Sequence, residues 1–186
     1  MRYLSVSYFL GSTTNQSEWE KISASDKSDI EILNSARLGT IDYDYESVKI
    51  IKEGGQAIVF EVKSKVDGEI YAAKRLQYQI GGKFNTSKIQ GAAEREIACL
   101  RALNHPMVIR IKDVVKDEDN FPCIIMEKCK QSLANIIKDY KSELIPEKHV
   151  LRIFTMICMP LYYIHSKKIV HRDLKPDNIL QKFIGG

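Results

Sequence analysis

The eight residues from His171 to Asn178, which read H-R-D-L-K-P-D-N, constrain this chain more than any other stretch. Asp173 can accept the proton of an attacking hydroxyl, and Lys175 places a fixed positive charge near a phosphoryl group. The carbonyl oxygen of Asn178 can hold a magnesium ion. A single Asp or His would more often belong to a surface loop. Eight residues in this order instead indicate a loop that carries catalysis.

The octapeptide resembles the catalytic loop of the eukaryotic protein kinases, and Lys175 two places after Asp173 resembles the serine/threonine branch. The resemblance implies an α+β fold, with an antiparallel five-stranded small lobe that holds one main helix. The helical beginning of a large lobe would follow. It also implies ATP and Mg²⁺ as cofactors and a protein with a serine or threonine hydroxyl as the acceptor.

From Val48 onward, the sequence consists of short β-rich segments separated by turns. Two hairpin strands that flank the Gly54-Gly55 pair suggest a lid over phosphates, although most Gly-Gly turns are structural. The second hairpin turns at Asp67-Gly68 and continues into a strand that ends at Lys74. This order resembles the glycine-rich loop and the lysine-bearing third strand of the kinases.

The glycine segment departs from the family pattern G-x-G-x-x-G-x-V. With Val59 on the valine, Lys52 occupies the first glycine position, Gly54 the second and Ala57 the third. The one glycine retained is the position where an absent side chain lets the backbone approach phosphates. We therefore expect a usable nucleotide lid, with Val59 and Ala72 lining the same site.

A helix over residues 86–103 is expected to carry an acidic partner for the third-strand lysine. By resemblance we pair Lys74 with Glu96, and Glu94 is the rival. The sequence Asn104-His105-Pro106 resembles the helix-exit signature of the family, and it sets the register on Glu96.

The strand that follows resembles the one that ends in the kinase inter-lobe hinge, here residues 127–130. On that alignment Met126 guards the back of the pocket. The carbonyl of Glu127 and the backbone of Cys129 would bond adenine, and Leu180 would lie beneath it. A structural role is more common than a reactive one for a thiol such as that of Cys129.

Residues 47–126 are thus expected to form the small lobe, and residues 131–186 the start of the large lobe. A short helix over 132–140 precedes a long apolar one that opens at Pro146. The long helix would leave an exposed apolar face that invites aggregation or a partner.

Residues 1–46 differ in composition from the kinase-like remainder, residues 47–186. Eight serines, and eight acidic against four basic residues, suggest a flexible extension of net charge −4. A short helix from Trp19 to Leu33 is the alternative. The whole chain carries +4, so residues 47–186 carry +8, which suits a polyanionic nucleotide. No basic run interleaves with aromatics, so nucleic acid is not an expected partner.

The four cysteines form no C-x-x-C pair and no zinc spacing, which is typical of reduced thiols in an intracellular protein. The cytoplasm is the expected compartment, with the nucleus open. No apolar run reaches the length of a membrane span, so no membrane contact is expected.

The tripeptide Asp-Phe-Gly, the second metal-binding motif of the family, occurs nowhere in the 186 residues. The sequence is therefore expected to represent a kinase domain only in part, and to be inactive alone. Two functions stay open: an ATP-dependent protein serine/threonine kinase seen as an incomplete chain, or a truncated kinase-like binding or regulatory protein without phosphotransfer. A small-molecule kinase is disfavoured because Leu174-Lys175-Pro176-Asp177 fits protein kinases closely.

Overall fold

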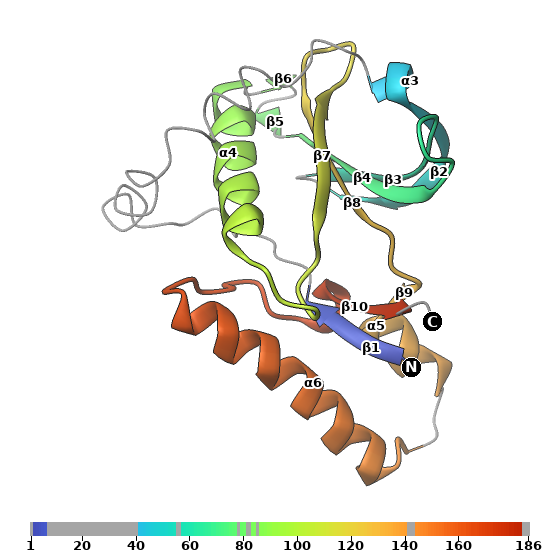
Figure 1. Ribbon diagram of the computed structural model, residues 1–186, viewed down its shortest axis with the longest axis vertical. Helices are drawn as coiled ribbons and strands as arrows, with labels where there is room; N and C mark the ends of the chain where they lie inside the picture. The colour runs from blue at the N-terminus through green and yellow to red at the C-terminus, as the bar shows by residue number, and fades with distance from the viewer. Residues whose placement is uncertain are drawn as a thin grey trace. The chain divides into compact units, whose positions relative to one another are not determined.

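The structure, a computed structural model, describes residues 2–6, 41–54, 57–77, 79–80, 83–84, 86–140 and 144–183 (Figure 1). Its contacts divide the chain into two compact units. The sheet unit spans residues 12–101 and 110–128, and the helical unit spans residues 1–11, 102–109 and 129–186.

An antiparallel five-stranded sheet in the order β2-β3-β4-β8-β7 is the centre of the sheet unit. Its strands are β2 (Tyr45–Glu53), β3 (Ala57–Ser64), β4 (Ile70–Leu76), β7 (Ile111–Lys116) and β8 (Pro122–Glu127). This confirms the predicted antiparallel five-stranded sheet. Hairpins account for three of the four pairings, because β2–β3, β3–β4 and β7–β8 each join neighbouring strands of the chain. The fourth pairing, β4 with β8, joins strands separated in the chain by α4 and β7.

The turn between β3 and β4 shows why the sequence makes a hairpin there. Gly68 has a φ of +74°, which a residue without a Cβ adopts at little cost. The Asp67 carboxylate accepts hydrogen bonds from the Glu69 amide at 3.0 Å and the Tyr71 hydroxyl at 2.9 Å. Lys112 of β7 lies 3.2 Å from the same carboxylate. The turn is thus tied to the far edge strand of the sheet.

The first strand of the five-stranded sheet, β2, begins at Tyr45, three residues before the predicted start at Val48. Tyr45 is 4% exposed and belongs to an apolar cluster on one face of the sheet. Burial of this large ring stabilises the pairing of residues 45–47 with β3. The helix α3 (Ile41–Asp44) precedes it, and Ile41 packs on the same cluster.

The helix α4 (Thr86–Ala102) confirms the helix expected over residues 86–103. Its buried residues recur at three- and four-residue steps: Ile89, Ala93, Ile97 and Leu100. A short hairpin of β5 (Gln79–Ile80) and β6 (Lys83–Phe84) lies before it and was not foreseen in the sequence.

The helical unit holds a second, three-stranded sheet in the order β1-β10-β9. Its strands are β1 (Arg2–Val6), β9 (Gln131–Ser132) and β10 (Ile179–Phe183), and its helices are α5 (Leu133–Asp139), α6 (Glu147–Ser166) and the 3₁₀ turn η1 (Pro176–Asn178). Leu133 and Ile179 form its small core, and half-buried residues of α6 such as Ile153 pack against them.

The predicted flexible extension, residues 1–46, differs from the structure at both ends. Arg2–Val6 pairs antiparallel with Ile179–Phe183, and residues 41–46 make α3 and the start of β2. A strand of five residues gains its stability from a partner far along the chain, so composition alone does not reveal it. The alternative helix from Trp19 to Leu33 lies outside the described residues.

The helix α6 carries an exposed apolar stripe, as its composition predicts. Leu151 is 58% exposed, Phe154 64% and Tyr162 80%, at spacings that place them on one side of the helix. Among the described residues, no helix combines the length and hydropathy needed to cross a bilayer.

Candidate functional site

A buried ion pair joins β4 to α4. Lys74 Nζ lies 2.7 Å from Oε1 and 2.6 Å from Oε2 of Glu96, and the two residues are 3% and 5% exposed. The rival Glu94 instead accepts a hydrogen bond from Gln90 at 3.3 Å. The structure therefore brings together the two residues that the sequence pairs, and it favours Glu96 over Glu94.

The cost of burying two charges makes the Lys74–Glu96 pair informative about function. Desolvation offsets much of the attraction, so a buried ion pair rarely stabilises more than packed apolar residues would. Removing one partner alone typically costs about 3–5 kcal/mol, because the other charge stays buried. A chain that keeps such a pair therefore holds a cation at a defined place, which is what binding an anion requires.

Four predicted nucleotide-site residues share one face of the sheet. Val59 is the cross-strand partner of Lys74, and Ala72 is the partner of Met126. Ala72 lies two residues before Lys74 in β4, so both side chains point to the same side. The register of three strands thus gathers Val59, Ala72, Lys74 and Met126, although their contacts with adenine and phosphate stay predictions.

The glycine segment between β2 and β3 is a turn closed by backbone and side-chain bonds. The Gly54 amide donates to the Ala57 carbonyl at 3.0 Å, and Gln77 Nε2 donates to the Gly54 carbonyl at 3.0 Å. A Cβ on Gly54 would lie 3.7 Å from the Ala57 oxygen, an ordinary contact. The fold itself therefore tolerates a side chain there, and a need for glycine would come from a ligand. Gly55 lies outside the described residues.

The end of β8 is fixed by two hydrogen bonds between Glu127 and Arg110. The Glu127 amide donates to the Arg110 carbonyl at 3.2 Å, and Glu127 Oε1 accepts from the Arg110 amide at 3.0 Å. The chain passes from the sheet unit to the helical unit between Lys128 and Cys129, within the predicted hinge 127–130. Cys129 is half-buried. The adenine contacts of Glu127 and Cys129 stay predictions.

An ion pair that the sequence did not reveal lies just before this passage. Lys128 Nζ lies 2.5 Å from Oε2 of Glu61 on β3, and Lys49 Nζ lies 3.6 Å from the same oxygen. Glu61 is the cross-strand partner of Lys49. Its contact with Lys128 depends on the register of three strands, and no local motif signals it.

In the helical unit, Asp173 is the centre of a hydrogen-bonded loop. Asn178 Nδ2 donates to Asp173 Oδ2 at 2.8 Å and to its main-chain oxygen at 2.9 Å. Lys175 Nζ lies 2.9 Å from Asp173 Oδ2. The structure thus brings together the three residues predicted for catalysis and metal binding.

The backbone of this loop is held in an uncommon conformation. Arg172 has a φ of +61°, in the left-handed region that residues with a Cβ seldom adopt. The Asp173 amide donates to the His171 carbonyl at 2.9 Å, and His171 is 2% exposed. A buried His171 and a strained Arg172 fix the direction of Asp173, and strain of this kind concentrates at functional sites. The sequence motif included both residues but assigned them no role.

Burial raises the pKa of Asp173, but hydrogen bonds from Lys175 and Asn178 and the charge of Lys175 outweigh it. The pKa of this carboxyl therefore lies below its ordinary value of 3.8. Asp173 stays ionised at neutral pH and is a weak base. It is better suited to orienting a hydroxyl and accepting its proton late than to removing that proton beforehand.

Leu180, predicted beneath adenine, lies in the middle strand of the three-stranded sheet. It pairs with Ser132 of β9 and with Ser5 of β1, and its side chain is half-buried. The Lys130 amide donates to the Gln181 carbonyl at 2.8 Å, which extends the β9–β10 contact toward residues 127–130. The predicted site residues thus fall into two groups, one in each unit.

Comparison with known proteins gives a consistent answer. A family model described as "Protein kinase domain" matches residues 45–183. The chain is 33% identical over 136 residues to "Cell division control protein 2 homolog 2" of Trypanosoma brucei brucei, covering 73% of this chain and 38% of that protein. It is 33% identical over 136 residues to "Serine/threonine-protein kinase Nek4" of Mus musculus, covering 73% of this chain and 17% of that protein.

A third relative is the "Carbon catabolite-derepressing protein kinase" of Saccharomyces cerevisiae, 34% identical over 139 residues, which are 74% of this chain and 21% of that protein. The chain thus spans between 17% and 38% of the length of these relatives. The family match covers three quarters of the chain and includes both polar clusters. The chain belongs to the protein kinase domain family.

Proposed function

We propose that this protein is an ATP-dependent serine/threonine protein kinase, which transfers the γ-phosphoryl group of MgATP to a protein hydroxyl. The observation that carries the proposal is the buried Lys74–Glu96 pair, a fixed cation kept at the cost of desolvating two charges. The Asp173 cluster and the serine/threonine kinases among the relatives support it.

The residues present fit a nucleotide with its magnesium ion. Lys74 would hold the phosphates, and the backbone of Glu127 and Cys129 would bond adenine. The side-chain amide nitrogen of Asn178 donates a hydrogen bond to Asp173, so the side-chain oxygen of Asn178 is the atom that would ligate Mg²⁺. Mg²⁺ is usually bound by few protein ligands together with waters and phosphates, and Asn178 would supply one of these ligands.

In the transfer step, Asp173 would orient the acceptor hydroxyl and accept its proton as the bond to phosphorus forms. Lys175, 2.9 Å from Asp173, would keep that carboxylate ionised and add positive charge beside the transferring group. The bound magnesium would supply charge neutralisation. Phosphoryl transfer depends mainly on positioning and charge, and these residues provide both.

The test uses the protein at its natural length, with Lys74→Met and Asp173→Asn variants. Lys74→Met is expected to weaken binding of MgATP, because the phosphates lose their cation. Asp173→Asn is expected to retain nucleotide but lower transfer about 100-fold or more, the scale of a positioned acid–base group. The measurements are fluorescent-nucleotide affinity and labelled phosphate incorporation, with phosphoamino-acid analysis expected to show phosphoserine or phosphothreonine.

Lys63→Met is the matched control, since Lys63 is exposed on β3 and lies outside both clusters. It is expected to behave as wild type. Lys74→Arg keeps the charge, and far-UV circular dichroism checks that each variant is folded. Equal nucleotide affinity and equal turnover in wild type and folded Lys74→Met would contradict the proposal, and phosphotyrosine as main product would contradict the specificity.

A second candidate function is a kinase-like binding or regulatory protein that holds nucleotide or a partner without transfer. The same experiment separates the two: this candidate predicts nucleotide binding that depends on Lys74 and no transfer that depends on Asp173. We also propose a reducing compartment such as the cytoplasm, where cysteines stay as thiols.

A further inference from the structure

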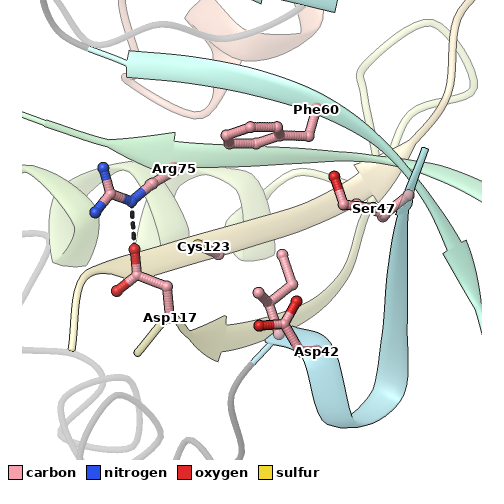
Figure 2. Close-up of a pocket in the computed structure, with 8 residues that line it drawn as sticks. Asp42, Ser47, Phe60, Arg75, Asp117 and Cys123 are labelled. Carbon is pink, nitrogen blue, oxygen red and sulfur yellow. Dashed lines mark hydrogen bonds and ion pairs between the residues drawn. The ribbon is translucent and has the colours of Figure 1, made fainter. Parts of the chain in front are cut away.

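The sheet unit carries a pocket of about 200 Å³ that the nucleotide proposal does not use (Figure 2). Arg75 lines it, whereas the preceding residue, Lys74, pairs with Glu96 of α4. Successive residues of a strand point to opposite faces. The pocket therefore lies on the face of the sheet opposite to the predicted nucleotide site.

The walls of the pocket are mainly apolar. They come from Ile41 of α3, Phe60 and Val62 of β3, and Cys123 of β8. Cys123 is 1% exposed, and burial raises the pKa of its thiol to about 12, so that it stays neutral. These walls favour an apolar group, because the part of a ligand that enters the pocket meets no charged side chain from them.

The rim of the pocket carries carboxylates. Figure 2 shows Asp117 beside Arg75, whose Nε donates to Asp117 Oδ2. Arg75 Nη2 also lies 2.9 Å from Asp119, and its guanidinium stands 4.7 Å from the centre of the Phe121 ring. The Phe121 amide donates to Asp117 Oδ1 at 2.7 Å. This guanidinium is thus held by two acidic side chains and a ring.

Asp42 supplies the opposite side of the rim, and its side chain is exposed. Lys65 Nζ donates to the main-chain oxygen of Asp42. Among the residues that line the pocket, Asp42 and Asp117 carry two carboxylates against the single cation of Arg75. The rim is therefore net negative and complements a cation that enters beside an apolar group.

The size of the pocket selects the kind of ligand. Its volume of about 200 Å³ is below the roughly 300–1,000 Å³ of small-molecule sites. One large side chain fits such a space. We propose that this pocket docks a protein partner through one Phe or Leu side chain, with an adjacent Arg or Lys of the partner at the Asp42 rim. This surface is separate from the proposed phosphotransfer and does not depend on it.

The test is a titration of the ¹⁵N-labelled 186-residue chain with the blocked peptide Gly-Ser-Arg-Phe-Ser-Gly to millimolar concentration. Saturable shifts are expected at the amides of Ser47, Val62 and Cys123. Peptides with Glu for Arg, or Ala for Phe, are expected to bind more weakly. Failure of the Arg-Phe peptide to shift these amides, or equal binding of the Ala peptide, would overturn the proposal.

Variants of exposed rim residues keep the test independent of folding. Asp42→Asn is expected to weaken the Arg-Phe peptide about threefold, the scale of an exposed ion pair. Ser47→Trp, which fills the pocket from its exposed edge, should abolish the saturable shifts. Glu46→Gln is the matched control, because it removes one negative charge from an exposed residue beside Ser47 that does not line the pocket. It should leave the affinity for the Arg-Phe peptide unchanged. Equal loss in Glu46→Gln and Asp42→Asn would show only a general charge effect and overturn the proposal.

Discussion

His105 is a single side chain whose charge state depends on where the chain buries it. Its ring stacks on Tyr163 of α6, with ring centres 5.0 Å apart and an interplanar angle of 24°. Its Nδ1 accepts a hydrogen bond from the Met107 amide at 3.1 Å, and the Asn104 amide donates to the Tyr163 hydroxyl at 2.8 Å. The turn after α4 is thereby joined to α6 by groups that suit a neutral imidazole.

Burial lowers the pKa of His105 from its ordinary value of 6.5. As pH falls through 6.5 the unfolded chain binds a proton that the folded chain resists. Stability from this group is therefore present above pH 6.5 and lost below it. We expect the free energy of unfolding to fall between neutral pH and mildly acidic pH in wild type, and to fall less in His105→Phe. Urea denaturation followed by circular dichroism measures both.

His149→Asn is the control for this pH effect, because His149 is exposed and its Nδ1 lies 3.2 Å from the Tyr140 hydroxyl. It should keep the pH dependence of wild type. The role of His105 is wrong if His105→Phe loses as much stability on acidification as wild type does.

At the scale of elements, α5 is short and depends on its first residue. Ser132 is the N-cap, and its hydroxyl accepts a hydrogen bond from the Asn135 amide at 3.2 Å. The same residue pairs with Leu180 through its backbone, so one position both starts a helix and ends a strand. Leu133, the first residue of α5, then enters the small core with Ile179.

Ser132→Ala should lower the free energy of unfolding by about 1 kcal/mol, because an orphan amide of the first turn loses its acceptor. Ser132→Asp should retain most of the stability, since a carboxylate also caps. Denaturation of the two variants beside wild type is the measurement. Equal free energies of unfolding for Ser132→Ala and wild type would show that the Ser132 cap does not stabilise the fold.

The sequence predicts the elements whose signals are local and misses those that need a distant partner. Hairpin turns and the spacing of apolar residues indicated the five-stranded sheet, α4 and α6. The strand β1 has no such signal, because Arg2–Val6 pairs with residues at the other end of the chain. In the candidate site, the Asn104-His105-Pro106 register led to Glu96. The Glu61–Lys128 pair and the pocket lined by Phe60, Arg75 and Cys123 arise from cross-strand register, which no motif encodes.

At the scale of the whole molecule, the two polar clusters belong to different units of the chain. Lys74 and Glu96 lie in the sheet unit, and Asp173 and Asn178 lie in the helical unit. Phosphoryl transfer needs such groups and the metal-binding carboxylates to act together. A polypeptide of these 186 residues lacks the Asp-Phe-Gly carboxylate in its sequence.

We therefore expect the 186-residue polypeptide, purified alone, to give no phosphate transfer that depends on Asp173, although weak nucleotide binding by the sheet unit can persist. The measurement follows labelled phosphate from ATP into a general acceptor protein, with the Asp173→Asn variant as control. Transfer well above background that disappears in the variant would refute this expectation. It would also point to another acidic residue, such as Asp177, as the metal ligand.

The pairing of β1 with β10 has a consequence for how the chain is made. Arg2 is matched with Phe183, 181 positions later (183 − 2), so β1 cannot form this pairing until β10 has been synthesised. Closing so long a loop is slow relative to forming local hairpins. Before that point Arg2–Val6 lacks its β10 partner, whereas the strands of the sheet unit can already pair. The pairing state of β1 thus reports whether β10 has been synthesised.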